Sequence, residues 1–129
     1  MRQVKYLQEQ GAARMIARKH RFHGHGSLRY VYRNGHTVRT ATTSLRYIVN
    51  QRRSTYRLAV VVSKKVSKSA VVRNRIRRRV YEIVRTNQTK IQEPYDMVFT
   101  VFSEQIANMP AEELRTIIIN QLQRATIIK

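Results

Sequence analysis

The residues most suited to chemistry in this sequence are gathered in one arginine-rich stretch, Val71–Arg85. Six of its residues are arginine, and Glu82 is its one acidic residue. A planar guanidinium group donates two parallel hydrogen bonds, a geometry that fits phosphate oxygens. Asn74 adds an amide for a phosphate or a base edge, and Tyr81 adds a ring that can stack on a base. The stretch therefore predicts a surface that binds the phosphates of a nucleic acid.

The same stretch carries an apolar side at helical spacing. The side is made by Val72, Ile76, Val80, Ile83 and Val84, which recur at i, i+4, i+8, i+11 and i+12. This pattern predicts a helix that docks on a core and leaves guanidinium groups outside. Because like charges at i and i+4 destabilise a helix by about 0.2–0.5 kcal/mol per pair, the arginines indicate a purpose other than folding.

A basic loop leads into this helix. The loop, Ser63–Ser69, holds three lysines among hydroxyl side chains. Helix and loop together give the candidate residues for binding nucleic acid, which are Lys64, Lys65, Lys68, Arg73, Asn74, Arg75, Arg77, Arg78 and Tyr81.

The charge balance of the whole chain favours a polyanionic partner. The 129 residues include 26 Lys and Arg against 7 Asp and Glu, for a formal net charge of +19. A compact domain with this imbalance repels itself unless a polyanion neutralises it, and nucleic acid is the leading candidate. An anionic membrane surface is the competitor, but no apolar run approaches the ~18 residues of a membrane span. The absence of cysteine fits a reducing cytosol, and no signal peptide is expected.

No catalytic constellation is visible. The acidic residues are dispersed, and the adjacent pair Glu112 and Glu113 is explained as favourable charge at a helix start. His23 and His25 lack the further ligands that a metal site needs. No glycine-rich phosphate loop or nucleophile elbow occurs. The chain alone is therefore interpreted as a binding protein and not as a nuclease.

Periodicity elsewhere predicts the elements that hold the arginine helix. We expect a helix at 28–34 capped by Ser27 and ended by Gly35, strands at 36–40, 42–50, 57–63 and 96–102, and a last helix from Pro110. The two strands that flank the arginine helix are expected to pair in parallel. We predict an α+β fold in the order α-β-β-β-α-β-α, a small mixed sheet of about four strands with helices packed mainly on one face.

Two neighbouring motifs give the sequence a specific resemblance. Ser63-Lys64-Lys65-Val66 is followed by Ala70–Arg78, which contains Arg73-Asn74-Arg75. The combination resembles the signature of the bacterial ribonuclease P protein subunit, in which a strand ends in a lysine run and a helix opens with Arg-Asn-Arg. The resemblance runs from His20 to Lys129. We therefore expect 20–129 to be the RNA-binding domain and 1–19 to be a basic N-terminal extension, either a solvated tail or an added RNA-contacting arm.

The resemblance implies a function as well as a fold. The fold is shared with a domain of a small-subunit ribosomal protein. The partners are the catalytic RNA of ribonuclease P and precursor tRNA, whose 5′ leader the holoenzyme removes to leave a mature 5′ end. Mg²⁺ is bound mainly by the RNA, so no catalytic or metal-binding residue is expected in this chain. A cytoplasmic location and no obligate protein partner are expected.

The resemblance also implies a cleft for the leader beside the sheet. Leu28 and Tyr32 match two aromatic positions of the family on the first helix, and Arg46 or Tyr47 falls near a cleft tyrosine on the second strand. Leu28 departs from the aromatic residue, Arg79 stands where an aliphatic residue is usual, and Tyr81 where arginine is often found.

Two other functions fit the same composition. One is a ribosomal or assembly protein that binds structured RNA without catalysis. A DNA-binding regulator would place the arginine helix in a major groove. Two features argue against the DNA-binding function. The strand, loop and helix arrangement packs the helix on a sheet, and no dimer element is visible.

Overall fold

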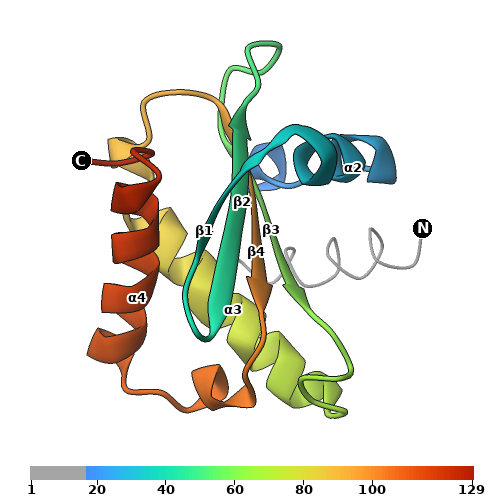
Figure 1. Ribbon diagram of the computed structural model, residues 1–129, viewed down its shortest axis with the longest axis vertical. Coiled ribbons are helices and arrows are strands. Elements are labelled where there is room, and N and C mark those ends of the chain that lie inside the picture. Colours follow the sequence, from blue (N-terminus) through green and yellow to red (C-terminus); the bar gives the residue numbers. More distant parts are fainter. Residues whose placement is uncertain (1–16) are drawn as a thin grey trace.

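Within residues 17–129, which a computed structural model describes, four strands form one mixed sheet in the order β1-β2-β4-β3 (Figure 1). Their bounds are His36–Arg39 (β1), Thr43–Val49 (β2), Arg57–Val62 (β3) and Tyr95–Val101 (β4). β1 pairs with β2 and β2 pairs with β4 in antiparallel fashion, whereas β3 runs parallel to β4. The parallel pairing expected of the two strands that flank the arginine helix is confirmed.

Three α-helices complete this part of the chain. They are α2 (His25–Asn34), α3 (Ala70–Thr86) and α4 (Ala111–Arg124). Short 3-10 turns lie at Arg18–His20 (η1), Gln88–Lys90 (η2) and Glu104–Ala107 (η3). The predicted α+β fold and its order α-β-β-β-α-β-α are confirmed. Of the predicted N-terminal extension, residues 1–16 lie outside the described part, and the division at residue 20 stays a prediction.

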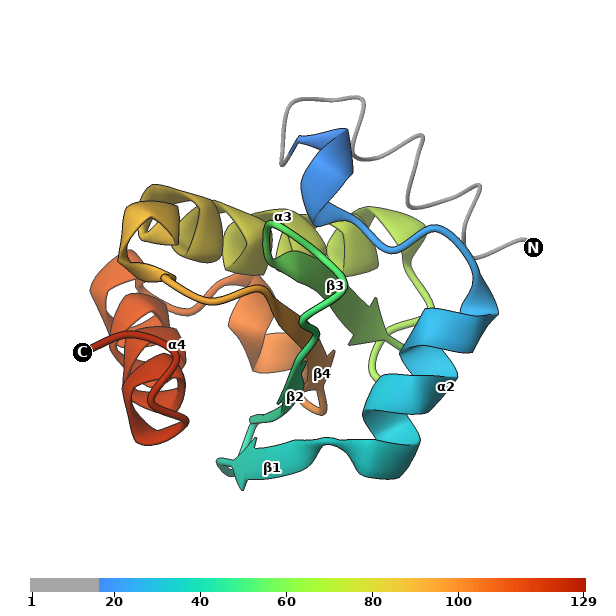
Figure 2. The ribbon, with the colours of Figure 1, turned by 90° about the horizontal axis from the view of Figure 1, so that it is seen from above.

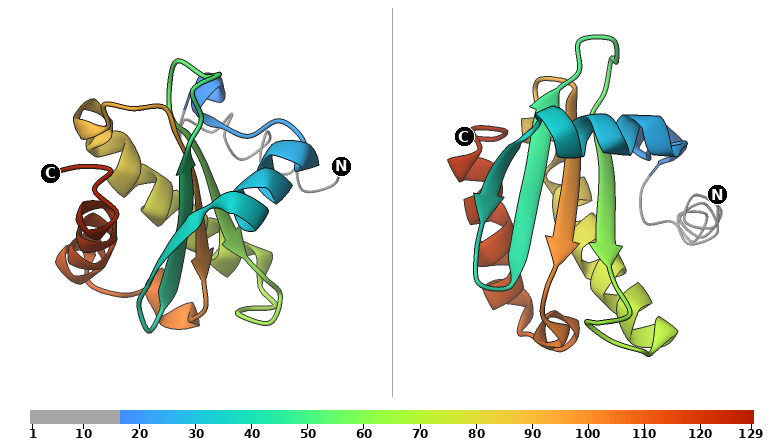
Figure 3. Two further views of the ribbon diagram at one scale, coloured as in Figure 1. Left: turned by 45° about the horizontal axis from the view of Figure 1, so that its top comes forward. Right: turned by 45° about the vertical axis from the view of Figure 1, so that its right-hand side comes forward.

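The two faces of the sheet are covered unequally. α3 and α4 pack on one face over a core that includes Leu45, Val60, Met97 and Phe99 (Figure 2). α2 crosses the other face, where Leu28 and Val31 meet Ala59 and Val98 together with Phe22. It lies over the upper part of the strands only, as the right panel of Figure 3 shows. The helices are thus mainly on one face, as predicted, and the third helix leaves the lower part of the second face without a helix.

The arginine helix α3 begins and docks for reasons that the sequence carries. Ser69 is its N-cap, and its Oγ accepts a hydrogen bond from the Val72 amide at 3.2 Å. The apolar side places Ile76, Val80 and Val84 in the core with no exposed surface. Burying each such side chain stabilises the fold by about 1.5–3 kcal/mol, which outweighs the repulsion among arginines.

The start of α2 differs from the prediction. Ser27 does not cap the helix, because the helix begins two residues earlier at His25 with Gly24 as N-cap. Gly24 adopts φ 123°, a left-handed conformation that glycine takes without strain. The predicted end at Gly35 is confirmed, where a Cβ atom would lie 2.6 Å from the Val31 carbonyl oxygen and 2.9 Å from that of Tyr47. Only glycine therefore permits the turn from α2 into β1.

The docking of α3 predicts that one substitution has a large effect on stability at one position and almost none at another. Ile76→Asp buries an unpaired charge and should lower the free energy of unfolding by several kcal/mol, on the order of 4 or more. Val71→Asp is the matched control, because Val71 lies one turn earlier on the same helix and is 69 % exposed. It should change the unfolding free energy by at most about 0.5 kcal/mol in chemical denaturation. Equal stability of the two variants would show that the Ile76 side of α3 is not buried.

Candidate nucleic-acid interface

The predicted phosphate-binding residues divide by exposure. Lys64, Lys65, Lys68, Arg75 and Arg78 are exposed, and Arg73 and Asn74 are half-buried. Arg73 Nη1 donates to the Ser67 carbonyl oxygen at 2.9 Å, so the first turn of α3 is tied to the lysine loop. This loop leads directly into the first half of α3, and we call their basic and amide residues together the basic ridge (Lys64, Lys65, Lys68, Arg73, Asn74, Arg75 and Arg78).

Two of the predicted residues, Arg77 and Tyr81, are not on that surface. Arg77 is 8 % exposed, and its Nη1 donates to Asn74 Oδ1 at 3.1 Å. Tyr81 is 2 % exposed, and burial raises the pKa of its phenol to about 12. The assignment of Tyr81 as a stacking residue is therefore wrong, since its ring lies in the core. The buried side of α3 is wider than the apolar stripe in the sequence indicates.

Arginines of α3 also hold the segment between β4 and α4. Arg79 donates from Nη1 to the Ile106 carbonyl oxygen at 2.7 Å and from Nη2 to the Met109 carbonyl oxygen. Arg75 Nη1 donates to Asn108 Oδ1 at 2.8 Å. Arg79 stands where the family usually has an aliphatic residue, and here its guanidinium group is bonded to two backbone carbonyl oxygens. It marks the edge at which the basic ridge gives way to internal contacts.

The second face of the sheet offers an uncovered strip below α2. Strand pairing places Ser44 opposite both Arg39 and Thr100, and Thr100 opposite Val61, so these side chains share a face. All are exposed or half-buried. Together with Thr37, Arg46 and Phe102 they form what we call the open sheet face. It ends where β3 runs into the lysine loop.

The residues predicted for the leader cleft take different positions around this face. Tyr32 of α2 is 45 % exposed, whereas Leu28 is 7 % exposed and packs on the sheet. Leu28 therefore serves mainly the core, although it also borders a hollow with His25, Arg29 and Tyr32.

Arg46 and Tyr47, the two residues predicted near the cleft on β2, lie on opposite faces of the sheet. Arg46 lies on the side of α2, where it donates to the carbonyl oxygens of Val31 at 3.3 Å and Tyr32 at 2.7 Å. It also donates to Thr37 Oγ1 at 2.6 Å. Tyr47 faces the other way, against Tyr95 and the core beneath α3 and α4. A cation at the carbonyl end of a helix is favourable, so Arg46 anchors α2 beside the open sheet face.

Sequence reasoning missed two residues of the open sheet face. The Arg39 guanidinium carbon lies 4.6 Å from the centroid of the Phe102 ring, which is 40 % exposed. Such a cation–aromatic pair offers both a charge for phosphate and a ring for a base. The sequence held a signal for these two residues, namely the alternation of side chains along a strand. Once the face of Arg46 is known, this alternation along β1 and β4 places Arg39 and Phe102 on the same face.

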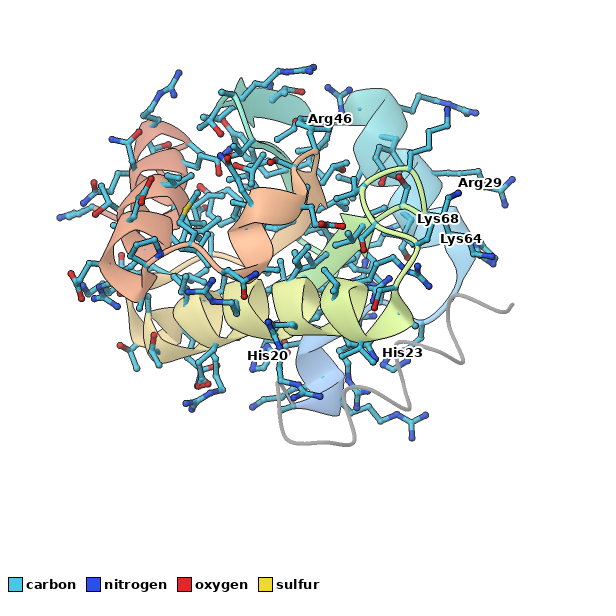
Figure 4. The ribbon with its side chains drawn as sticks, turned by 90° about the horizontal axis from the view of Figure 1, so that it is seen from below. His20, His23, Arg29, Arg46, Lys64 and Lys68 are labelled. Atoms are coloured by element: carbon cyan, nitrogen blue, oxygen red, sulfur yellow. The ribbon has the colours of Figure 1, made fainter. Side chains whose placement is uncertain are left out.

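A long segment of the chain holds no acidic residue. Residues 10–81, which include α2, the first three strands and the lysine loop, contain no Asp or Glu. The later carboxylates lie on α3 beyond Tyr81, before β4, within β4 as buried Asp96, in η3 and at the start of α4. Figure 4 shows Lys64, Lys68 and Arg29 projecting on the same side of the molecule. The excess of positive charge therefore lies chiefly in residues 10–81, which favours a phosphate-bearing partner.

Histidine and carboxylate positions suit structure more than metal binding. Within residues 17–129, no group of three or more His, Cys, Asp or Glu side chains comes together as a metal site. The His20 ring stacks on Tyr56 at 4.0 Å between centroids, and its Nδ1 lies 3.0 Å from the Tyr56 carbonyl oxygen. Burial lowers the pKa of His20, which favours the neutral ring in this stack. In the same part of the chain, no helix combines the length and apolarity needed to cross a membrane.

Comparison with known proteins decides the family. A family model described as Ribonuclease P matches residues 16–126. The chain belongs to the bacterial ribonuclease P protein family. Ribonuclease P is an endoribonuclease, and members of this family are its protein component, which implies tRNA processing and RNA binding. The resemblance carried by the lysine run and the Arg-Asn-Arg motif is thus confirmed.

Relatives match over most of their length. The ribonuclease P protein component of Roseiflexus castenholzii is 37% identical over 99 residues, which are 77% of this chain and 80% of that protein. That of Clostridium botulinum strain Loch Maree is 37% identical over 100 residues, 77% of this chain and 87% of that protein. These two ribonuclease P proteins therefore match about three quarters of this chain.

Solved structures share the fold. The RNase P protein of Staphylococcus aureus superposes with a TM-score of 0.76 at 22% identity, covering 85% of this chain and 98% of that one. The RNase P protein from Thermotoga maritima gives a TM-score of 0.72 at 24% identity, covering 81% and 96%. Such likeness at low identity shows the ribonuclease P protein fold and leaves the roles of individual residues to their local geometry.

The contacts of Arg79 predict a stability effect that its neighbour lacks. Arg79→Ala leaves the carbonyl oxygens of Ile106 and Met109 without their donor and should cost about 1–3 kcal/mol of unfolding free energy. Arg78→Ala removes an exposed arginine next to it and should cost at most about 0.5 kcal/mol. Urea denaturation of both variants measures the difference. A loss at Arg78 as large as that at Arg79 would contradict this division of the helix.

Burial of Tyr81 predicts a pH dependence of stability. The pKa is raised from about 10 in the unfolded chain to about 12 in the folded protein, because burial disfavours the phenolate. The stabilising contribution is complete below about pH 10 and is lost as pH rises toward 12. Tyr81→Phe should therefore lose less stability than the parent between these pH values in urea denaturation. Tyr30→Phe, at an exposed tyrosine, should behave like the parent, and a parental slope in Tyr81→Phe would refute the burial argument.

Proposed function

We propose that this chain binds the catalytic RNA of ribonuclease P through the basic ridge and assists Mg²⁺-dependent removal of the 5′ leader from precursor tRNA. The observation that carries the proposal is the segregation of charge. Exposed Lys64, Lys65, Lys68, Arg75 and Arg78 form one surface in a part of the chain that has no carboxylate between residues 10 and 81. Two polyanions approach more easily when such a surface neutralises phosphates and releases condensed counterions.

The leader of the precursor is assigned to the open sheet face. Single-stranded RNA binds to surfaces that combine cations along the backbone with aromatic rings for the bases. Tyr32, Arg39 and Phe102 supply these groups beside half-buried hydroxyl side chains of Ser44 and Thr100. Because this face meets the lysine loop at the end of β3, one RNA strand can pass from the rings to the basic ridge.

The chemistry of leader removal is assigned to the RNA. Mg²⁺ prefers oxygen ligands, chiefly carboxylates and phosphates. Asp96, the buried carboxylate near α2, is held by Arg57 at 2.8 Å and is 1 % exposed. The described side chains therefore do not fit a metal centre, and we place Mg²⁺ on the partner RNA in the cytoplasm, where the substrate tRNA is matured. The chain contributes binding, orientation and neutralisation of charge.

Reconstitution with the organism's own catalytic RNA and one precursor tRNA tests the function. The protein should lower the Mg²⁺ concentration needed for leader cleavage, because lysine and arginine replace part of the neutralising ions. Arg78→Ala should raise that concentration again and should lessen the slope of log affinity against log salt by about 0.7–0.9, one phosphate contact. Cleavage that is unchanged by the protein at low Mg²⁺ would overturn the proposal.

A matched control removes the same charge from another face. Arg115 is exposed on α4, beside Glu112 and Glu113 and away from the basic ridge. Arg115→Ala should leave both the Mg²⁺ requirement and the salt slope near those of the parent. Equal effects of the two substitutions would show that net charge alone, and not the basic ridge, determines RNA binding.

A further inference from the structure

A second hollow lies on the far side of α2 from the open sheet face. α2 packs over the row of the sheet that contains Ala59 and Val98. Val61 and Thr100 lie two residues further along their strands, on the open side, whereas Arg57 and Asp96 lie two residues back. Arg57 and Asp96 form part of a hollow of about 440 Å³, whose lining also includes Gly26, Tyr30, Asn50 and Arg52.

The floor of this hollow is a fully buried ion pair that orients an amide. Arg57 donates from Nε to Asp96 Oδ1 at 2.9 Å and from Nη2 to Oδ2 at 2.8 Å. Asn50 Nδ2 donates to the same Oδ2 at 2.9 Å, while Asn50 Oδ1 accepts from the Arg52 amide at 3.1 Å. Both ends of the Asn50 amide are therefore assigned and fixed. A side chain held in this way is preorganised to read a ligand.

Asn50 lines the hollow and retains unused hydrogen-bonding capacity. A primary amide has two N–H donors and two acceptor lone pairs. Among residues 17–129, Asn50 uses one donor on Asp96 and one lone pair on Arg52. A donor beside an acceptor on one planar group matches the N7 and N6 edge of adenine, which asparagine bonds in bidentate fashion.

The walls supply the other parts of a nucleotide site. Tyr30 is 53 % exposed and offers its ring for stacking. It lies two positions before Tyr32 on α2, and the helical turn of about 200° between them sends the two rings to opposite flanks of the helix. Exposed Arg52 stands at the rim, where a phosphate can reach its guanidinium group. A Cβ built on Gly26 would meet nothing within 4 Å, so the α2 wall leaves open space.

We propose that this hollow is a second RNA subsite that takes an unpaired base, with adenine preferred. Asn50 reads the base edge, Tyr30 stacks on the base, and Arg52 contacts its phosphate. The inference rests on the proposed function, namely that the chain binds RNA. α2 then separates two single-strand sites, one on the open sheet face beside Tyr32 and one in the hollow beside Tyr30.

Adenosine and uridine monophosphate are the direct probes of the subsite. Titration of ¹⁵N-labelled full-length protein with adenosine monophosphate should shift the Asn50 side-chain amide and the Gly26 backbone amide. Uridine monophosphate should shift them less, and Asn50→Ala should remove the difference between the nucleotides. Shifts confined to the lysine loop for both nucleotides would overturn the proposal. Melting of Asn50→Ala checks the fold, which Arg57 should maintain by keeping Asp96 paired.

Variants of Tyr30 test the subsite in the holoenzyme and identify the source of the base. Tyr30→Ala should weaken RNA binding about fivefold or more, the loss of one stacking contact, while Tyr30→Phe keeps the ring and the affinity. If Tyr30→Ala weakens binding to the catalytic RNA in the absence of tRNA, the base in the subsite comes from that RNA. Weaker binding to precursor tRNA but not to mature tRNA assigns it to the leader.

Failure of the subsite can be told apart from failure of the proposed function. If Tyr30→Ala binds both RNAs like the parent while Arg78→Ala weakens binding to the catalytic RNA, the subsite is refuted and the function of the basic ridge stands. If Arg78→Ala is also without effect, the proposed function itself is refuted.

Discussion

The structure depends on how an arginine-rich helix can dock on an apolar core. Burial of Ile76, Val80 and Val84 contributes about 1.5–3 kcal/mol each, against a few tenths of a kcal/mol for each repulsive arginine pair. Docking is further helped because the Arg79 guanidinium group donates to the backbone carbonyl oxygens of Ile106 and Met109. The helix therefore presents only part of its arginine content to a partner. That part is continuous with the lysine loop, and the remainder stabilises the fold.

The two faces of the sheet differ in how far helices cover them. One face is covered by α3 and α4, and the other is crossed by α2 near one end of the strands only (Figure 3). Arg46 fixes the end of α2 through the Val31 and Tyr32 carbonyls, and Gly35 permits the sharp turn that follows. Rigid elements position side chains more precisely than loops do. The backbone of α2 is thus fixed relative to the sheet at its C-terminal end.

Sequence patterns predicted the elements well and the surface less well. Strand and helix bounds fell within a few residues, because period 2 and period 3.6 are local signals. The pattern could not tell that Tyr81 and Arg77 are buried, since the width of a docking face depends on the partner elements. The hydrogen bonds from Arg79 to Ile106 and Met109 could not be predicted either, because these partners lie 27 and 30 positions further along the chain. Period 2 separated Arg46 from Tyr47 but could not say which of the two faces α2 would cover.

The strand order β1-β2-β4-β3 has a consequence for synthesis of the chain. β4 lies between β2 and β3, so neither strand has its central partner until Tyr95–Val101 has left the ribosome. α3 leaves earlier, with its arginines and its apolar side both unsatisfied. For that interval the nascent chain is a polycation beside ribosomal and messenger RNA, without the sheet that later hides its apolar side. α3, the proposed RNA-binding helix, is therefore synthesised before the strand that completes the sheet on which it docks.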